Sequence, residues 1–126
     1  MPAERAAYPL RRYGRRLAMV ATLAVVLVIA WGSLSPAEEL PANLPWDKLN
    51  HLSAYAALAL VAGLAGLRPW RAAALAIIYG VAIEFAQVAV PGRQGGDWLD
   101  ILANGLGALI AWLVLAAWQR FFSSRD

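Results

Sequence analysis

Four long apolar runs dominate the chain, and each has roughly the 17–25 residues that a helix needs to cross a lipid bilayer. The segments between them are rich in turn-forming residues, above all proline and glycine. Only 15% of the residues are charged, against about 25% in an average soluble domain. The sequence therefore predicts an all-α protein, a single domain over 1–126 that forms an integral membrane bundle of four transmembrane helices. The four predicted helices cover residues 17–34, about 48–67, 72–90 and 97 to about 118.

The basic residues predict how such a bundle is oriented. If all four helices cross, then the N-terminal segment 1–16, the turn at 68–71 and the C-terminus lie on the same side. Nine of the eleven basic residues fall on that side, and only Lys48 and Arg93 fall on the other. Basic residues gather on the cytoplasmic side of membrane helices. We therefore expect a multi-pass protein of the bacterial cytoplasmic (inner) membrane with both termini in the cytoplasm.

The first apolar run also resembles a cleaved signal peptide, because basic residues precede it and the small residues Ser33 and Ser35 follow it. Pro36 would directly follow the cleaved bond, which we expect to hinder cleavage, and the run is long for a signal peptide. We therefore favour an uncleaved first helix. It lacks a polar face, so we expect it to pack and anchor the bundle.

Polar and small residues recur at three- and four-residue steps in the other three segments, which places them on one face of each helix. In each segment the polar half lies toward the predicted outer surface and the small half toward the cytoplasm. Small residues let helices approach closely in lipid. We expect the three helices to touch at their inner halves and to open outward around a polar bowl. The faces are Asp47, His51, Tyr55, Ala59, Gly63 and Gly66; Ala73, Ala76, Gly80, Glu84 and Gln87; and Asp97, Asp100, Asn104, Gly107 and Ala111.

Ionisable residues inside an apolar run are costly in a membrane, so they usually face the bundle interior or a wet cavity. We predict three catalytic residues in the bowl: His51 as general base or acid, Glu84 as proton donor and Asp100 as the residue that orients His51. Lys48 and Arg93 could hold a phosphate, Arg93 through a bidentate fork. The full set of predicted substrate-binding residues is Lys48, Arg93, Asn104, Asp47, Tyr55, Gln87 and Asp97.

Less specific roles remain open for several of these residues. Gln87 and Asn104 could simply form hydrogen bonds between helices. Tyr55 could be a packing residue with a satisfied hydroxyl, and Asp47 and Asp97 could be helix N-caps. The chain has no cysteine and no G-x-S-x-G motif. The sequence therefore leaves open whether the protein is an enzyme or a non-catalytic binding or accessory protein whose polar cluster is a structural network.

A divalent metal is a further alternative, with His51, Glu84, Asp97 and Asp100 as ligands. The single histidine and the lack of a dedicated motif argue against it, and we predict no metal and no cofactor. The expected partner is a membrane lipid or a lipid-linked envelope precursor, and not a nucleic acid. Oligomeric state is not predicted.

Four short motifs in this order resemble the VanZ-like family of membrane proteins. They read D-K-x-x-H-x-x-x-Y from Asp47, E-x-x-Q from Glu84, P-x-R from Pro91, and D-x-x-x-N-x-x-G from Asp100. The resemblance covers residues 47–107. It departs at Leu52, where an aromatic residue often follows the histidine. It implies a cell-envelope membrane protein in a family named for a member linked to low-level resistance to the glycopeptide antibiotic teicoplanin, and it leaves the reaction open.

Overall fold

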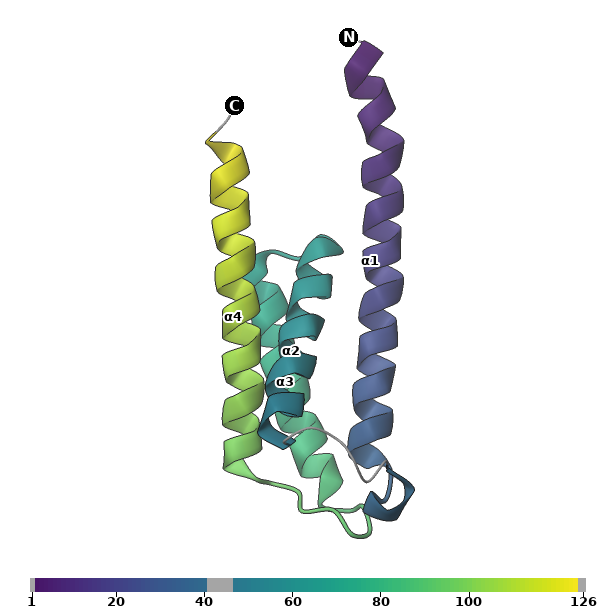
Figure 1. The fold of residues 1–126 in the computed structure, drawn as a ribbon, viewed down its shortest axis with the longest axis vertical. Coiled ribbons are helices and arrows are strands. Elements are labelled where there is room, and N and C mark those ends of the chain that lie inside the picture. The colour runs from purple at the N-terminus through teal and green to yellow at the C-terminus, as the bar shows by residue number, and fades with distance from the viewer. Residues whose placement is uncertain (1, 41–46, 125–126) are drawn as a thin grey trace.

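The computed structural model describes residues 2–40 and 47–124, with side chains from residue 11 onward within those ranges. These residues form helices and no strands, which confirms the predicted all-α class (Figure 1). The helices are α1 (Pro2–Leu34), the short 3-10 helix η1 (Ala37–Glu39), α2 (Asp47–Leu64), α3 (Pro69–Gln87) and α4 (Trp98–Ser123).

The four long helices run alternately up and down, so that both ends of the described chain lie at the same end of the bundle (Figure 1). We call this the terminal end, and it also holds the turn between α2 and α3. The opposite end, which we call the polar end, holds the connections from α1 to α2 and from α3 to α4. Helix α1 packs against α2 and α3 and makes no contact with α4 within the described residues. The tightest unit is therefore formed by α2, α3 and α4.

The helix bounds differ from the predicted ones for local reasons. Helix α2 ends at Leu64 because Gly66 adopts a φ of +116°, a conformation that glycine tolerates. The N–H groups of Gly66 and Leu67 then donate to the carbonyls of Gly63 and Ala62, which closes the helix end. Helix α3 begins at Pro69, since proline suits the first position of a helix.

The two outer helices are longer than predicted. Helix α1 continues through the basic N-terminal segment to Pro2, and α4 continues past Trp118 to Ser123. Both extensions are rich in residues such as Ala, Arg and Leu or Gln that favour helix, and no turn residue interrupts the end of α4.

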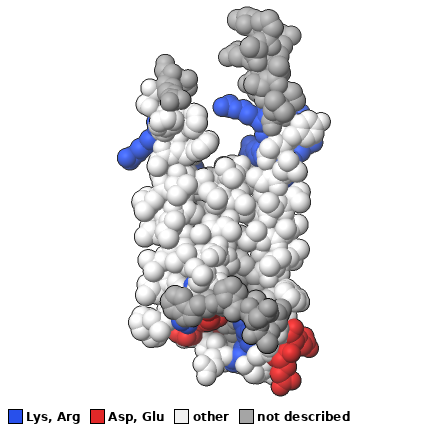
Figure 2. Space-filling model, in the orientation of Figure 1, with Lys and Arg blue, Asp and Glu red and all other residues white. Residues whose placement is uncertain are grey.

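Three helical segments of the described chain are long and apolar enough to cross a membrane: Arg11–Leu34, Pro69–Gln87 and Trp98–Ser123. Helix α2 is not among them, because its first two turns carry Asp47, Lys48 and His51. Figure 2 shows charged side chains near both ends and a broad uncharged belt between them. This distribution is the one expected of a protein whose middle faces lipid.

Close helix contacts depend on glycine, as predicted. A Cβ on Gly107 would lie 2.1 Å from the carbonyl oxygen of Leu52, so α4 and α2 touch backbone to backbone there. A Cβ on Gly80 would lie 2.9 Å from the side chains of Asn104 and Tyr55. These contacts lie in the polar halves of the predicted faces or next to them. We had expected the helices to open into a wide polar bowl at this end. They instead stay close together, and the polar residues between them are largely buried.

Candidate functional site

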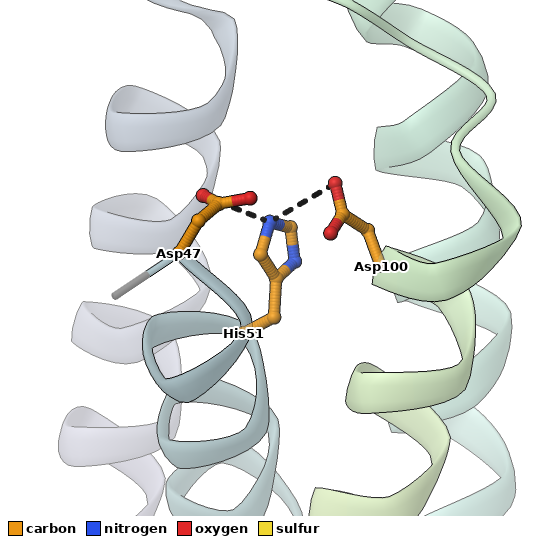
Figure 3. Close-up of side chains that lie close together, drawn as sticks. All are labelled: Asp47, His51 and Asp100. Atoms are coloured by element: carbon orange, nitrogen blue, oxygen red, sulfur yellow. Dashed lines mark ion pairs between the residues drawn. The ribbon is translucent and has the colours of Figure 1, made fainter. Parts of the chain in front are cut away.

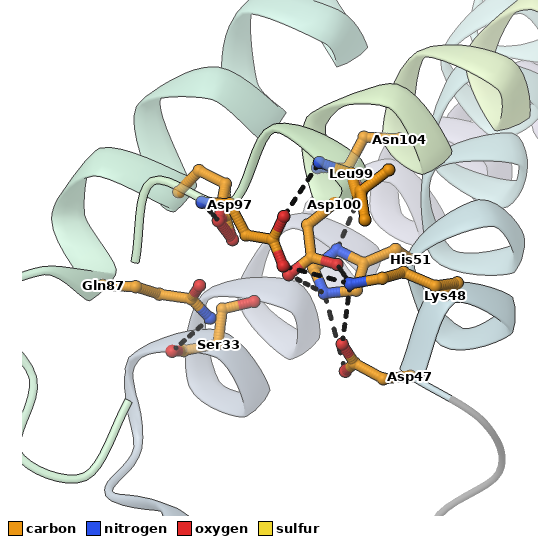
Figure 4. Close-up of polar contacts among 10 residues, drawn as sticks. Ser33, Asp47, Lys48, His51, Gln87, Asp97, Leu99, Asp100 and Asn104 are labelled. Carbon is orange, nitrogen blue, oxygen red and sulfur yellow. Dashed lines mark hydrogen bonds and ion pairs between the residues drawn. The ribbon is translucent and has the colours of Figure 1, made fainter. Parts of the chain in front are cut away.

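The predicted site residues come together at the polar end, where the first turns of α2, the last turn of α3 and the start of α4 meet (Figure 4). Four polar side chains are buried there. The buried four are Glu84, Gln87, Asp100 and Asn104.

Lys48 lies among three carboxylates. Its Nζ donates to Asp100, lies 3.3 Å from Oδ2 of Asp97 and lies 3.6 Å from Oδ2 of Asp47. The ammonium group thus offsets the mutual repulsion of acids from α2 and from the start of α4. The predicted contact between Lys48 and a phosphate remains a prediction, and in this arrangement the lysine already has acidic partners.

The His51 imidazole connects α2 to α4 through both ring nitrogens, through one to Asp100 (Figure 3) and through the other to Asn104 (Figure 4). Nδ1 lies 2.9 Å from Oδ1 of Asn104. An amide oxygen only accepts, so Nδ1 carries the hydrogen and donates it. Nε2 then faces Oδ1 of Asp47 at 3.7 Å and Oδ2 of Asp100 at 3.6 Å. Nε2 is therefore the atom through which His51 could exchange a proton with a ligand, with Asp100 placed where it could orient the ring.

Glu84 is almost completely enclosed, with 1% of its surface exposed. Its Oε2 accepts the Asp97 N–H at 3.2 Å, and its main-chain carbonyl accepts the Gly96 N–H at 3.0 Å. Its Oε1 has no hydrogen-bond partner among the described residues. The connection from α3 to α4 thus folds back over Glu84, and this path needs glycine because a Cβ on Gly95 would lie 2.3 Å from the Val88 nitrogen.

Asp97 is the N-cap of α4, which is one of the two roles, N-cap or substrate-binding residue, that the sequence left open for it. Its Oδ1 accepts the Leu99 N–H at 2.9 Å. That hydrogen bond, together with the neighbouring Lys48 ammonium, lowers the pKa of the Asp97 carboxyl below its ordinary value. Asp97 therefore stays ionised to lower pH than a free aspartate. Asp47 instead lies in the first turn of α2, where its carboxylate faces both Lys48 and His51.

Gln87 and Tyr55 have contrasting surroundings. Gln87 Nε2 donates to the carbonyl oxygen of Ser33 at 2.9 Å, which ties the end of α3 to α1. The Tyr55 ring is buried with its centroid 6.3 Å from that of Tyr79. Its hydroxyl has no hydrogen-bond partner among the described residues, so the expectation of a satisfied hydroxyl was wrong.

Two cavities meet at this cluster. The first has a volume of about 340 Å³ and lies between α1 and α2, with a mostly apolar lining. The second has about 210 Å³ and a mostly polar lining that includes Gln87, Asp97 and Asp100. Glu84 lines neither cavity. The residues that line both are Asp47, His51 and Arg93.

Arg93 differs from Lys48 in having no side-chain hydrogen bond or ion pair with any described residue. It lies in the connection between α3 and α4, where it lines both cavities. A guanidinium that is free of carboxylate partners keeps its planar fork of donors available for an anion. Among the described residues of the site, Arg93 is therefore the basic side chain best placed to meet a ligand.

The contribution of α1 was missed in the sequence. Its last turns supply the apolar wall of the first cavity, including Trp31 and Gly32, and the Ser33 carbonyl that accepts from Gln87. The contribution of α1 consists of a main-chain carbonyl and apolar side chains. Neither produces a periodic pattern of polar residues that could be seen in the sequence. The small residues Gly32 and Ser33 at the end of the run were the only available indication.

The structure brings together fewer potential metal ligands than the four considered from the sequence. Asp47, His51 and Asp100 offer potential ligand atoms that all lie within 4.8 Å of one another. Glu84 and Asp97, which we had considered as ligands, are not part of this group within the described residues. The Lys48 ammonium beside Asp100 competes with a cation for the same carboxylate. The absence of a metal or cofactor remains a prediction.

The fold and the cluster define a helical protein of membrane type with ionisable side chains gathered at one end of the bundle. The chain belongs to the VanZ/LLP1 family, whose model matches residues 4–119. This match confirms the resemblance seen in the four motifs and extends it to α1 and most of α4. Searches among curated proteins and among solved structures found no match to the chain.

Proposed function

We propose that this protein binds, and acts on, a phospholipid head group or a lipid-linked envelope precursor at the polar end of the bundle. In this proposal it crosses the bacterial inner membrane four times, with both termini in the cytoplasm and the polar end at the outer face. The asymmetry of basic residues supports this orientation, since the terminal end holds Arg11, Arg12, Arg15 and Arg16. Helix α2 would cross as part of the bundle, with its polar turns shielded by α3 and α4.

The observation that carries the proposal is the junction of an apolar and a polar cavity at Asp47, His51 and Arg93. An amphiphile needs these two environments side by side. A hydrocarbon chain would lie between α1 and α2, against Ile29 and Trp31, while the head group would occupy the polar cavity. Burial of apolar surface contributes about 0.8 kcal/mol per methylene, so even a short length of chain would add to binding.

The residues at the junction suggest separate roles. Arg93 would hold a phosphate through its guanidinium fork. Nε2 of His51 would exchange a proton with the head group, while Nδ1 stays fixed on Asn104. Lys48 would keep Asp97 and Asp100 in place as their counter-ion. Glu84 lines neither cavity, so its effect would reach the ligand through the Asp97 backbone that it holds.

The alternative is a binding or accessory protein that does not turn its ligand over. The pairing of Lys48, His51, Asp100 and Asn104 with one another favours it, because such a network also fixes the register of α2 against α4. In that case the ligand would be captured or shielded. The family resemblance would make an envelope precursor the natural ligand, and expression in a susceptible host would then reduce susceptibility to teicoplanin.

Native mass spectrometry of the purified protein tests the binding site. The wild-type protein is expected to retain a lipid that Arg93→Ala loses, and Arg93→Lys to retain it only partly because lysine lacks the bidentate fork. Arg120→Ala is the matched control, since it removes the same charge from the exposed end of α4. Equal retention by Arg93→Ala and Arg120→Ala would contradict a site at Arg93.

A second comparison separates an enzyme from a binding module. Wild type and His51→Ala would be incubated with the retained lipid class, and the lipids would then be extracted and weighed by mass spectrometry. An enzyme yields a product with the wild type and none with His51→Ala, although both retain lipid. Retention without product in either protein would establish the binding alternative.

A further inference from the structure

A third hollow lies at the terminal end, on the side of the bundle where the described residues of α1 and α4 make no contact. It has a volume of about 1440 Å³ and is open to the outside. Figure 2 shows the notch between the two helices at this end, with basic side chains on its α1 side. Its lining comes from three helices, namely Arg11, Arg12, Tyr13, Gly14, Arg15, Arg16, Leu17, Ala18 and Ala21 of α1, Val61 and Leu64 of α2, and Trp118 of α4.

Positive charge is concentrated in this lining without an acidic partner. The four arginines form two pairs at four-residue spacing, Arg11 with Arg15 and Arg12 with Arg16, an arrangement that is unfavourable for like charges. None of the four has an ion pair with a residue whose side chain the structure describes, and the acidic residues with described side chains all lie at the polar end or in the connection before α2. The four guanidinium groups are therefore available to an anion from outside the chain.

Arg15 is held in position across the hollow. Its Nε donates to the carbonyl oxygen of Ala65, at the end of α2, at 2.9 Å. Its guanidinium lies so close to Gly66 that a Cβ there would be 2.7 Å from Nη2. One arginine is thus fixed beside the turn after α2, where its remaining N–H groups can meet an anion together with those of its neighbours.

The part of the hollow that lies toward the middle of the bundle is apolar. Leu17 and Ala21 of α1 face Val61 and Leu64 of α2, and Trp118 closes the far side from α4. A free phosphate would satisfy the arginines and leave this apolar space unfilled. A molecule with an anionic head and a hydrocarbon tail matches both parts, and a bilayer supplies such molecules at the gap between two crossing helices.

We propose that the hollow at the terminal end is a binding site for an anionic phospholipid. Its phosphate lies among Arg11, Arg12, Arg15 and Arg16, and an acyl chain fills the gap between α1 and α4 beside Trp118. Basic pockets between membrane helices bind anionic head groups in this way. The site lies in the leaflet opposite to the polar end, so it does not depend on the ligand proposed there.

Native mass spectrometry with added lipid tests this site. Protein in mild detergent is titrated with phosphatidylglycerol or with phosphatidylcholine of the same chain length. The wild type is expected to bind one phosphatidylglycerol about tenfold more tightly than phosphatidylcholine, and Arg12→Gln/Arg16→Gln to lose that preference. The matched control Arg68→Gln/Arg71→Gln removes two charges from the same end but from residues outside the lining, and is expected to keep it. Equal binding of the two lipids by the wild type, or equal loss in both variants, would overturn the proposal.

A fluorescence measurement makes the test independent of how the arginine variant folds. The measurement uses a Trp31→Phe background, which removes the tryptophan of the apolar cavity at the polar end. Brominated phosphatidylglycerol should quench the remaining tryptophan emission, and the further change Trp118→Phe should remove the part that saturates with one lipid. Persistence of the saturable quenching in Trp31→Phe/Trp118→Phe would place the lipid elsewhere and overturn the proposal.

Discussion

Nδ1 of His51 lies 2.9 Å from Oδ1 of Asn104, and this contact joins the second turn of α2 to the second turn of α4. These two helices share the most extensive contact in the bundle. The hydrogen bond therefore has a structural role in addition to any chemistry, because it sets the position of the imidazole whose other nitrogen faces Asp47 and Asp100.

A double-mutant cycle measures this hydrogen bond. His51→Ala and Asn104→Ala should each lower the free energy of unfolding in detergent, and the double variant should lose less than the sum. We expect a coupling free energy of about 0.6–1.7 kcal/mol, the range found for hydrogen bonds between membrane helices. Additive losses would show that the two side chains act independently.

The backbone contact at Gly107 predicts a sharp difference between two glycines of α4. Gly107→Ala should destabilise the protein by about 1–3 kcal/mol, because its Cβ would meet the Leu52 carbonyl and force the helices apart. Gly105→Ala is the control, since a Cβ there would meet no described atom within 4 Å beyond its own chain neighbours and helix backbone. It should be neutral or stabilising by up to about 1 kcal/mol through helix propensity. Thermal unfolding of the two variants checks the pair, and equal effects would contradict the contact.

The buried Tyr55 and the half-buried Tyr79 should respond differently to loss of the hydroxyl. Tyr79→Phe removes the hydrogen bond to the Val26 carbonyl, 2.7 Å long, and should cost about 0.5–1.5 kcal/mol. Tyr55→Phe removes a hydroxyl without a described partner and should leave stability unchanged or raise it by about 1–3 kcal/mol. Denaturant unfolding gives both values. Destabilisation by Tyr55→Phe would mean that its hydroxyl binds a group outside the described structure.

The start of α1 and the end of α4 lie at the same end of the bundle, which predicts that both termini lie on the same side of the membrane. Reporters fused before Met1 and after Asp126 should give signals from the same side of the membrane, and from the cytoplasmic side if the arginine-rich end is inside. A reporter that is active only outside the cytoplasm should therefore be silent at both positions. Signals from opposite sides would show that α2 does not cross.

Much of the fold was predictable from the sequence because helices are governed by local spacing. The four apolar runs predicted four helices, and the three- and four-residue steps correctly placed Gly80, Glu84 and Gln87 on a buried face of α3. The same reasoning placed Asp100, Asn104 and Gly107 on the buried face of α4. Helix bounds were less accurate, because a φ such as that of Gly66 and the first-turn preference of Pro69 shift an end by several residues.

The sequence by itself determined which side chains share a helical face and that the ionisable ones gather at one end of a membrane-type bundle. Only the tertiary structure decided how they pair: Lys48 with Asp97 and Asp100, Gln87 with the Ser33 carbonyl, and Arg93 with none of the described residues. The physical reason is that the first property depends on local spacing within one helix and the second on contacts between segments that are far apart in the sequence. A face follows from the 3.6-residue period of one helix, whereas a partner depends on how closely two helices approach at Gly107 and on the path of the chain from α3 to α4.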